Sequence, residues 1–228
     1  MANIVELKKV DKVYRGTIDT QVLFGINLSF EQGSFNSIVG ESGSGKSTLL
    51  NIIGTLDRPT SGELWLEGRS TSSLNADRMA ELRNRSIGFV FQFHYLLPEF
   101  SAMDNVLMPW LISNRRADAG VKKRAEELFD LMDIARVKYN MANKMSGGQQ
   151  QRTAIARALM NSPSVFLADE PTGNLDSENT GVIYRILRDV NRQLGTTFII
   201  ITHDRRIAEQ TDRIVEIKDG RIVMDSSR

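Results

Sequence analysis

The chain has 228 residues, of which 41% are hydrophobic and 25% are charged, and its formal net charge is +1. This composition excludes a disordered or fibrous chain, and the length predicts one domain with room for a sizeable insertion. The charge lacks the basic surplus of proteins that bind nucleic-acid backbones, and the absence of cysteine excludes disulfides and thiolate metal sites.

Short β-branched and aromatic runs alternate with helical patterns along the chain, which indicates an α/β sheet with crossover helices. The first strands are expected to be antiparallel, and Asp219-Gly220 between the last two is a hairpin signal. The runs SVFLAD and TTFIIIT are almost continuously apolar, as in strands buried on both faces of a parallel sheet. Strands are predicted at 3–9, 22–30, 35–39, 62–67, 87–91, 164–169, 197–202, 213–218 and 221–225.

Strand signals vanish between about residues 93 and 163, where helical spacing replaces them in three stretches, DNVLMPWLISN, AGVKKRAEELFDLMDI and GGQQQRTAIARALMN. One stretch of this segment, AGVKKRAEELFDLMDI, places its apolar residues on one helical face and its charges on the other. We therefore expect a single domain, 1–228, in which a helical subdomain at 93–163 is inserted into an α/β core made of 1–92 and 164–228. The apolar face comprises Val121, Ala125, Leu128, Phe129 and Met132.

The sequence from Gly40 to Thr48 reads GESGSGKST and matches the phosphate-binding pattern G-x-x-x-x-G-K-[ST] between an apolar run and a helical one. Glycines there let backbone N–H groups converge on phosphate oxygens at a helix start. Lys46 is expected to reach the β- and γ-phosphates of ATP, and Ser47 to ligate Mg²⁺. The alternative, an incidental glycine-rich turn, has a chance probability of roughly 1% in a chain of this length. The predicted phosphate-binding residues are Gly40, Ser42, Gly43, Ser44, Gly45, Lys46, Ser47 and Thr48.

Two adjacent carboxylates, Asp169 and Glu170, end the apolar run VFLA. In enzymes with a phosphate-binding loop, such a strand end reaches the metal, so Asp169 is expected to hold Mg²⁺ and Glu170 to orient the attacking water. Taken alone, an Asp-Glu pair at a strand end is also compatible with a solvated turn.

The sequence Met145-Ser146-Gly147-Gly148-Gln149 introduces an amphipathic helix that Ser146 is suited to cap. Glycines beside a free helix N-terminus form a second anion site, although a plain loop and cap remain the alternative. Ser146 follows Lys46 by 100 residues and lies in the helical insert. One chain is therefore not expected to close both anion sites on the same nucleotide.

The order of these motifs resembles the ATP-binding-cassette (ABC) family, whose signature is Leu-Ser-Gly-Gly-Gln; Met145 replaces the leucine, a change of similar volume. The resemblance implies a P-loop NTPase core with an N-terminal antiparallel β subdomain and an inserted helical one. It implies that two copies enclose two ATP molecules, each between one Lys46 loop and the other copy's Ser146 helix. By position, the resemblance implies that Tyr14 stacks on adenine, that Gln92 senses the metal and the attacking water, and that His203 contacts the γ-phosphate. It also implies nucleotide contacts by the signature residues Ser146, Gly147, Gly148 and Gln149. The loop of Asn174, Leu175 and Asp176 is implied to make contacts across the dimer.

The stretch from Phe91 to Phe100, with ADEPTGNLD and SGGQQQR, resembles the LolD-like and MacB-like branch of this family. The resemblance implies an ATPase at the cytoplasmic face of the bacterial inner membrane, bound to integral permease subunits with periplasmic domains. That branch acts in lipoprotein release, in macrolide or peptide export, or in cell-division signalling. The apolar residues after Gln92 are expected to help form the groove for the membrane partner, or alternatively to pack in the subdomain core. They are Phe93, Tyr95, Leu96, Leu97 and Phe100.

A soluble ABC-superfamily ATPase that acts on nucleic acid or in cell-division signalling is the alternative function. DNA-handling members carry a very long coiled coil or cysteine zinc sites, and this chain has neither a long insertion between Lys46 and Ser146 nor any cysteine. No apolar run approaches the roughly 18 residues of a membrane span, so any membrane role is expected to come through a partner.

Overall fold

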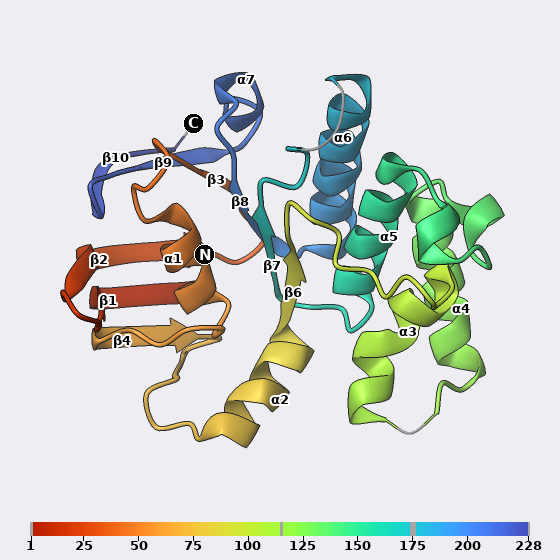
Figure 1. Ribbon diagram of the computed structural model, residues 1–228, viewed down its shortest axis with the longest axis horizontal. Helices are drawn as coiled ribbons and strands as arrows, with labels where there is room; N and C mark the ends of the chain where they lie inside the picture. Colours follow the sequence, from red (N-terminus) through yellow and green to blue (C-terminus); the bar gives the residue numbers. More distant parts are fainter. Residues whose placement is uncertain (1, 115, 174–176, 228) are drawn as a thin grey trace.

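Two sheets and a layer of helices lie side by side in the computed structural model, which describes residues 2–114, 116–173 and 177–227 (Figure 1). The antiparallel sheet, at the left of the view, has the strand order β2-β1-β4-β5. The other sheet has the order β10-β9-β3-β8-β7-β6, in which only the β9–β10 pair is antiparallel. The helical layer, which we define as α3, α4 and α5, lies at the right.

The predicted strands are confirmed, with some different ends. The antiparallel sheet consists of β1 (Asn3–Tyr14), β2 (Thr20–Glu31), β4 (Ser61–Leu66) and β5 (Arg69–Ser70). The second sheet consists of β3 (Phe35–Val39), β6 (Ile87–Val90), β7 (Val165–Asp169), β8 (Thr197–Ile201), β9 (Arg213–Lys218) and β10 (Arg221–Ser227). The prediction ended β1 at residue 9, which is wrong, because the strand continues to Tyr14 through register shifts that interrupt its alternation. The two-residue β5 was not predicted.

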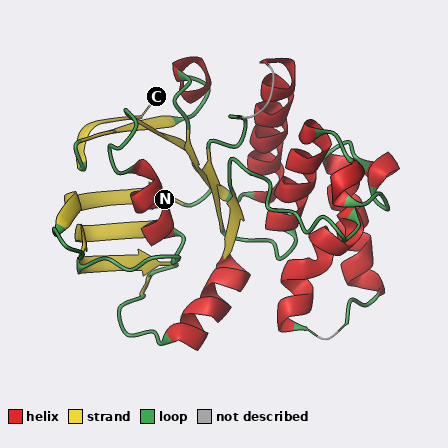
Figure 2. Cartoon of the chain, viewed as in Figure 1, coloured by secondary structure: helices red, strands yellow, loops and turns green. Residues whose placement is uncertain are grey.

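The helices surround the strands on several sides, as Figure 2 shows in red. They are α1 (Lys46–Ile53), α2 (Ala76–Ser86), α3 (Ala102–Ser113), α4 (Ala119–Leu131), α5 (Gly147–Leu159), α6 (Ser177–Leu194) and α7 (Arg205–Ala208), with 3-10 turns at Ala135–Val137 and Ala142–Lys144. The prediction placed α1, α3, α4 and α5 but assigned no helix to the other segments. The predicted apolar face of 119–134 is buried as expected.

The strands of the parallel sheet separate two hydrophobic clusters. In β7, Val165 and Leu167 belong to the cluster that contains α1 and the antiparallel sheet, whereas Phe166 and Ala168 belong to the cluster that contains α5 and α6. Successive side chains of a strand point to opposite faces, so this alternation is what a strand buried on both faces requires. It places α1 and α5 on opposite faces of the sheet, as the ribbon also shows (Figure 1).

Capping hydrogen bonds set the starts of the helices in the helical layer. The Ser101 hydroxyl accepts from the Asp104 N–H, and the Asp104 carboxylate accepts from the Ser101 N–H at 3.1 Å, which forms a capping box at the start of α3. The Asp118 carboxylate accepts from the Val121 N–H at 2.9 Å and begins α4. Every helix in the described part of the chain is too short or too polar to cross a bilayer.

Candidate active site

The loop between β3 and α1 opens into a cavity of about 490 Å³ at the carboxyl edge of the parallel sheet. Strand ends meet at this edge, so residues distant in sequence converge on it. Most of the predicted phosphate-binding residues line the cavity together with the predicted Glu170 and His203. The lining is Val22, Gly40, Ser42, Gly43, Gly45, Lys46, Ser47, Thr48, Glu170 and His203. Ser44, in the same loop, is buried.

Lys46 begins α1 and directs its ammonium group into the loop. Its Nζ donates to the carbonyl oxygens of Gly40 at 2.9 Å and Glu41 at 2.7 Å, and the residue is only 8% exposed. The N-terminal N–H groups of α1 add a positive dipole end beside this charge. The loop therefore places the Lys46 ammonium group beside the backbone N–H donors of a helix N-terminus, and this combination binds phosphate.

Asp169 lies at the end of β7 within hydrogen-bonding reach of Ser47. Burial raises the pKa of the Asp169 carboxyl, while the hydrogen bond from the Ser47 hydroxyl and the nearby Lys46 charge favour the ionised form. A hydroxyl and a carboxylate side by side are the oxygen donors that Mg²⁺ takes when nucleotide phosphates and water complete its shell. Among the described residues, no three His, Asp or Glu side chains gather into a metal site on their own.

Glu170 follows Asp169 with a left-handed backbone (φ 47°) that is uncommon for a non-glycine residue. Its N–H donates to the Ile201 carbonyl at 3.1 Å, which ties it to the end of β8. Its Oε1 lies 3.2 Å from Nδ1 of His203. Strained backbone of this kind is found at functional sites, and here it turns the carboxylate toward the cavity that Lys46 and His203 also line.

Gln92 follows β6 and lies against Gly173, a residue in the turn after Glu170. A Cβ atom added to Gly173 would lie 2.8 Å from Nε2 of Gln92, and the Gly173 N–H donates to the Glu170 carbonyl at 3.1 Å. Gln92 is not among the residues that line the cavity. Its predicted role in sensing metal and water stays a prediction, and its position beside the Glu170 turn is compatible with it.

Tyr14 ends β1 and is 43% exposed, outside the lining of the cavity. Its hydroxyl donates to Asp57 Oδ2 at 3.0 Å, and Lys12 Nζ lies 4.8 Å from the ring centroid. These contacts fix the ring at the surface of the antiparallel sheet. Adenine stacking by Tyr14 stays a prediction.

The second predicted anion site lies at the start of α5. The Ser146 hydroxyl accepts from the Gln149 N–H, and Gln149 Oε1 accepts from the Ser146 N–H at 2.9 Å, so the two residues form a capping box. Ser146 and Gly147 are exposed. Because α5 and α1 lie on opposite faces of the sheet, the structure does not bring Ser146, Gly147, Gly148 and Gln149 into the Lys46 cavity.

Two contacts around the phosphate loop were not predicted. Val22 of β2 lines the cavity, and the turn between β9 and β10 supports the loop from below, since the Gly220 N–H donates to the Ser44 carbonyl at 3.0 Å. The sequence indicated the hairpin turn at Asp219-Gly220, but it did not indicate that this turn contacts the phosphate loop at Ser44. The predicted contacts of Asn174, Leu175 and Asp176 lie outside the described residues.

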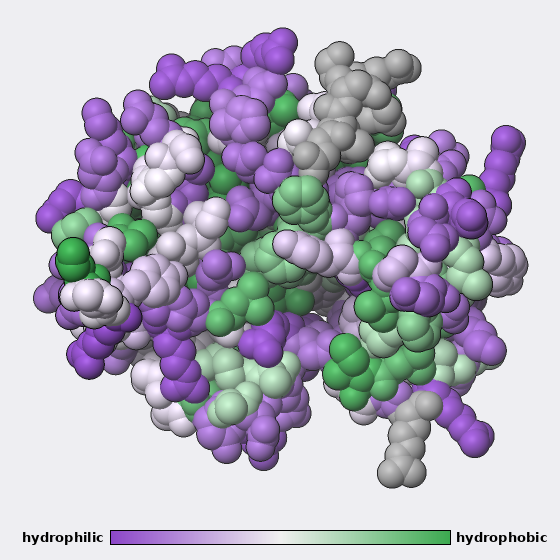
Figure 3. All heavy atoms as spheres, in the orientation of Figure 1, coloured by the Kyte–Doolittle hydropathy of each residue, from purple (hydrophilic) through white to green (hydrophobic). Residues whose placement is uncertain are grey.

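The segment after Gln92 divides between surface and core. Phe93 and Tyr95 are 61% and 64% exposed, and Leu97 and Phe100 are also exposed. Leu96 packs against the core of the helical layer, so for this residue the alternative interpretation as core is right. Hydrophobic surface also gathers over α3 (Figure 3).

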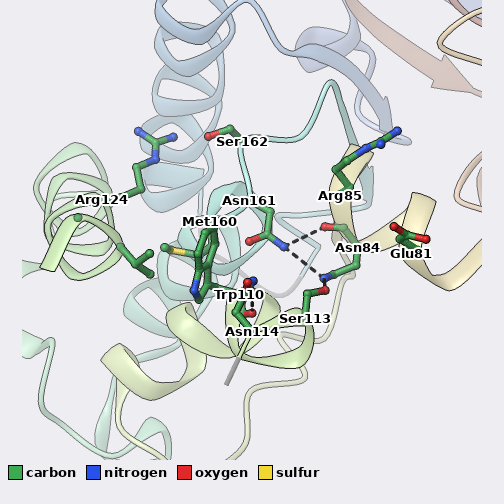
Figure 4. Close-up of a pocket in the computed structure, with 12 residues that line it drawn as sticks. Glu81, Asn84, Arg85, Trp110, Ser113, Asn114, Arg124, Met160, Asn161 and Ser162 are labelled. Carbon is green, nitrogen blue, oxygen red and sulfur yellow. Dashed lines mark hydrogen bonds between the residues drawn. The ribbon is translucent and has the colours of Figure 1, made fainter. Parts of the chain in front are cut away.

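Another cavity, of about 440 Å³, lies among α2, α3, α4 and the turn after α5 (Figure 4). Asn161 crosses it and donates from Nδ2 to the carbonyl oxygens of Asn84 at 2.9 Å and Pro109 at 3.2 Å. The Asn84 side chain in turn donates to Ser113 Oγ at 2.6 Å. These hydrogen bonds join α2 to α3, and they involve none of the residues that line the Lys46 cavity.

Comparisons with known proteins agree with this geometry. The family model described as ABC transporter matches residues 23–173. The chain is 50% identical to the lipoprotein-releasing system ATP-binding protein LolD 1 of Rhodopseudomonas palustris over 97% of this chain and 99% of that protein. It is also 50% identical to LolD of Anaeromyxobacter dehalogenans, over 97% and 93%. A dimeric post-hydrolysis structure of the ATP-binding cassette MJ0796, bound to ADP and Pi, is 42% identical and covers 98% of both chains with a TM-score of 0.89.

Proposed function

The chain belongs to the ABC transporter family as an ATP-binding and ATP-hydrolysing subunit of a bacterial transporter, and on that premise we propose roles for its site residues. Lys46 and the backbone N–H groups of its loop bind the phosphates, Glu170 accepts a proton from the attacking water, and His203 orients Glu170 and contacts the γ-phosphate. The observation that carries this proposal is that Lys46, Glu170 and His203 line one cavity, with Oε1 of Glu170 3.2 Å from Nδ1 of His203.

Mg²⁺ would be held by Ser47 and Asp169 and, after closure, would involve Gln92. When bound, the ion neutralises developing charge on the phosphate oxygens. The partly buried Asp169 carboxyl accepts a hydrogen bond from the Ser47 hydroxyl, so both oxygen donors are already side by side. The adenine would stack on Tyr14, whose ring is held at the surface by Asp57 and Lys12.

Two copies of the chain complete each active site in this proposal. Ser146 and Gly147 are exposed at the start of α5, on the face of the sheet opposite to α1, so they are available to a nucleotide held by a second copy. The dimeric structure of MJ0796 bound to ADP and Pi supports this arrangement. Asp176, Gly148 and Gln149 would add contacts across the same interface. We retain 93–163 as a subdomain of the single domain 1–228.

The membrane partner would be a permease with periplasmic domains, and the process lipoprotein release at the cytoplasmic face of the inner membrane. The names of the relatives in Rhodopseudomonas and Anaeromyxobacter support lipoprotein release over a nucleic-acid or cell-division role. Exposed aromatic side chains at Phe93 and Tyr95 supply an apolar surface that a membrane subunit would cover.

The Glu170→Gln substitution tests the proposed chemistry and the composite site together. The amide cannot accept the proton, so ATP turnover should fall by roughly 10²- to 10⁴-fold, while ATP still binds. The variant should therefore accumulate as an ATP-dependent dimer in analytical ultracentrifugation. A second substitution, Ser146→Arg, should abolish that dimer without changing ATP binding to the monomer. Parental turnover by Glu170→Gln would show that another group activates the water.

The docking surface has a separate test in the complex with the membrane subunits. Replacing Phe93 and Tyr95 by serine should leave the ATP turnover of the isolated chain within about two-fold and should weaken co-purification with the permease, because surface substitutions rarely disturb the fold. A matched control is Ile18→Ser, which removes another exposed apolar side chain (81% exposed) from the loop between β1 and β2. Equal co-purification of both variants would contradict the proposed docking surface.

A further inference from the structure

His94 lies between the exposed aromatic residues Phe93 and Tyr95 but turns the other way. It is partly buried, and its Nδ1 hydrogen-bonds Oε1 of Gln151 on α5. Because the amide oxygen accepts, Nδ1 of His94 is the donor. The segment therefore has two sides, an outward one formed by the aromatic rings and an inward one that His94 joins to α5.

Gln151 is fully buried in the first half of α5. Its Nε2 is buried with no hydrogen-bond partner in the described part of the chain, so the amide is paired only through Oε1, which accepts from His94. A buried polar side chain left wholly unpaired would be costly. The position of His94 relative to α5 is therefore tightly specified.

Arg157 holds the same segment roughly two turns further along α5. Its guanidinium donates to the Tyr95 carbonyl at 2.6 Å and to the His94 carbonyl at 2.9 Å. Both acceptors are main-chain atoms, so Arg157 fixes the backbone of the segment whatever its outward side chains contact. With Gln151, this gives α5 two points of attachment to the residues that follow Gln92.

The two ends of this attachment are both parts of the proposed machinery. The N-terminus of α5 carries Ser146, one turn before Gln151, and the attached segment follows Gln92 directly. His94 and Arg157 therefore connect the segment to α5 directly, by contacts that do not involve the core of the sheet.

We propose that His94 is a positioning residue that, with Arg157, holds α5 in the orientation in which Ser146 can receive the nucleotide of a second copy. This inference rests on the proposed composite site. Docking of a membrane subunit on Phe93 and Tyr95 then alters dimer closure through the His94–Gln151 hydrogen bond. If the bond is lost, α5 occupies the competent orientation for a smaller fraction of the time, and the apparent affinity for the second copy falls by that fraction.

The test uses the full chain with Glu170→Gln, in which the ATP-dependent dimer persists. His94→Leu removes the donor, whereas His94→Asn retains an N–H group near the place of Nδ1. We expect His94→Leu to lower the association constant of the dimer with ATP by about 2- to 10-fold, the range of one hydrogen bond, and His94→Asn to stay within about two-fold of the parent. Binding of a fluorescent ATP analogue to the monomer should be unchanged in both variants, whereas the Tm should fall by a few degrees in His94→Leu alone, because that variant leaves the buried Gln151 amide unpaired.

A double-mutant cycle with Gln151→Met separates this bond from general packing. If the two residues act as a pair, the double variant should lose no more affinity than the worse single variant. A dimer of parental affinity in His94→Leu, equal losses in His94→Leu and His94→Asn, or additive losses in the cycle would each overturn the inference alone. A Glu170→Gln parent that stays monomeric with ATP would overturn the composite site, and the inference with it.

Discussion

Gly173 offers a way to move Gln92 without altering it. In Gly173→Ala, the new Cβ would lie 2.8 Å from Nε2 of Gln92, where ordinary contact begins at about 3.4 Å. The amide would have to withdraw by roughly 0.6 Å, which a flexible side chain can do at little cost in stability. A misplacement of about 1 Å at a catalytic group can cost on the order of 100-fold in rate. We therefore expect the kcat for ATP hydrolysis to fall about 10-fold, with little change in KM.

The assay is steady-state phosphate release at saturating ATP, together with the Tm of each variant. Gly181→Ala is the matched control, because its Cβ meets nothing within 4 Å. It lies in α6, where alanine is favoured over glycine by roughly 1 kcal/mol, so this control should keep its kcat and gain stability. An unchanged kcat in Gly173→Ala would refute the argument that the position of Gln92 limits the reaction.

Two further predictions concern stability. Gly220→Ala combines a left-handed backbone (φ 70°) with a Cβ only 2.1 Å from the Val22 carbonyl oxygen, so it should lower the free energy of unfolding by more than about 2 kcal/mol. The control Gly195→Ala has a similar backbone (φ 65°) but open space around the Cβ, so it should lower the free energy of unfolding by only about 1 to 2 kcal/mol. Equal losses for the two variants in urea unfolding would contradict the close contact at Gly220. The hydrogen bond from Arg188 lowers the pKa of the half-exposed Asp212 carboxyl, and burial partly opposes this effect. The ionised carboxylate therefore stabilises the fold above the unfolded pKa of about 3.9, and this stabilisation is lost as the pH falls through the folded pKa. Asp212→Asn should thus cost up to about 1 kcal/mol at pH 7 and less at pH 3, and a loss independent of pH would contradict this assignment.

The phosphate loop and the acidic strand end could be predicted because their signals are local. A strand, a glycine-rich loop and a helix follow one another directly around Lys46, and Asp169 ends an apolar run, so no knowledge of distant contacts was needed. The support of the loop by Gly220 was not predictable. It depends on the order of strands in the sheet, which brings the β9–β10 turn under the loop and leaves no trace in the spacing of residues.

The helices that the prediction omitted differ in how readable they are. In α2, Met79 and Ser86 are the buried residues, so there is little apolar periodicity to detect. In α6, by contrast, Ile183, Leu187 and Val190 are buried at helical spacing, and this signal could have been used. The attachment of His94 to Gln151 had no signal at all, because it pairs two polar residues from separate segments.

The alternation of side chains in β7 has a consequence for mixtures of active and inactive copies. In the proposed dimer, a copy with a defective Glu170 would still present an intact Ser146 to its neighbour, because α1 and α5 are held on opposite faces of one strand layer. Such a copy would occupy partners without releasing them, so an inactive allele expressed beside the normal gene should interfere with it rather than be silent. Such dominance would be a genetic consequence of the two-residue period of β7, because that period places the helices that carry Lys46 and Ser146 on opposite faces of the same chain.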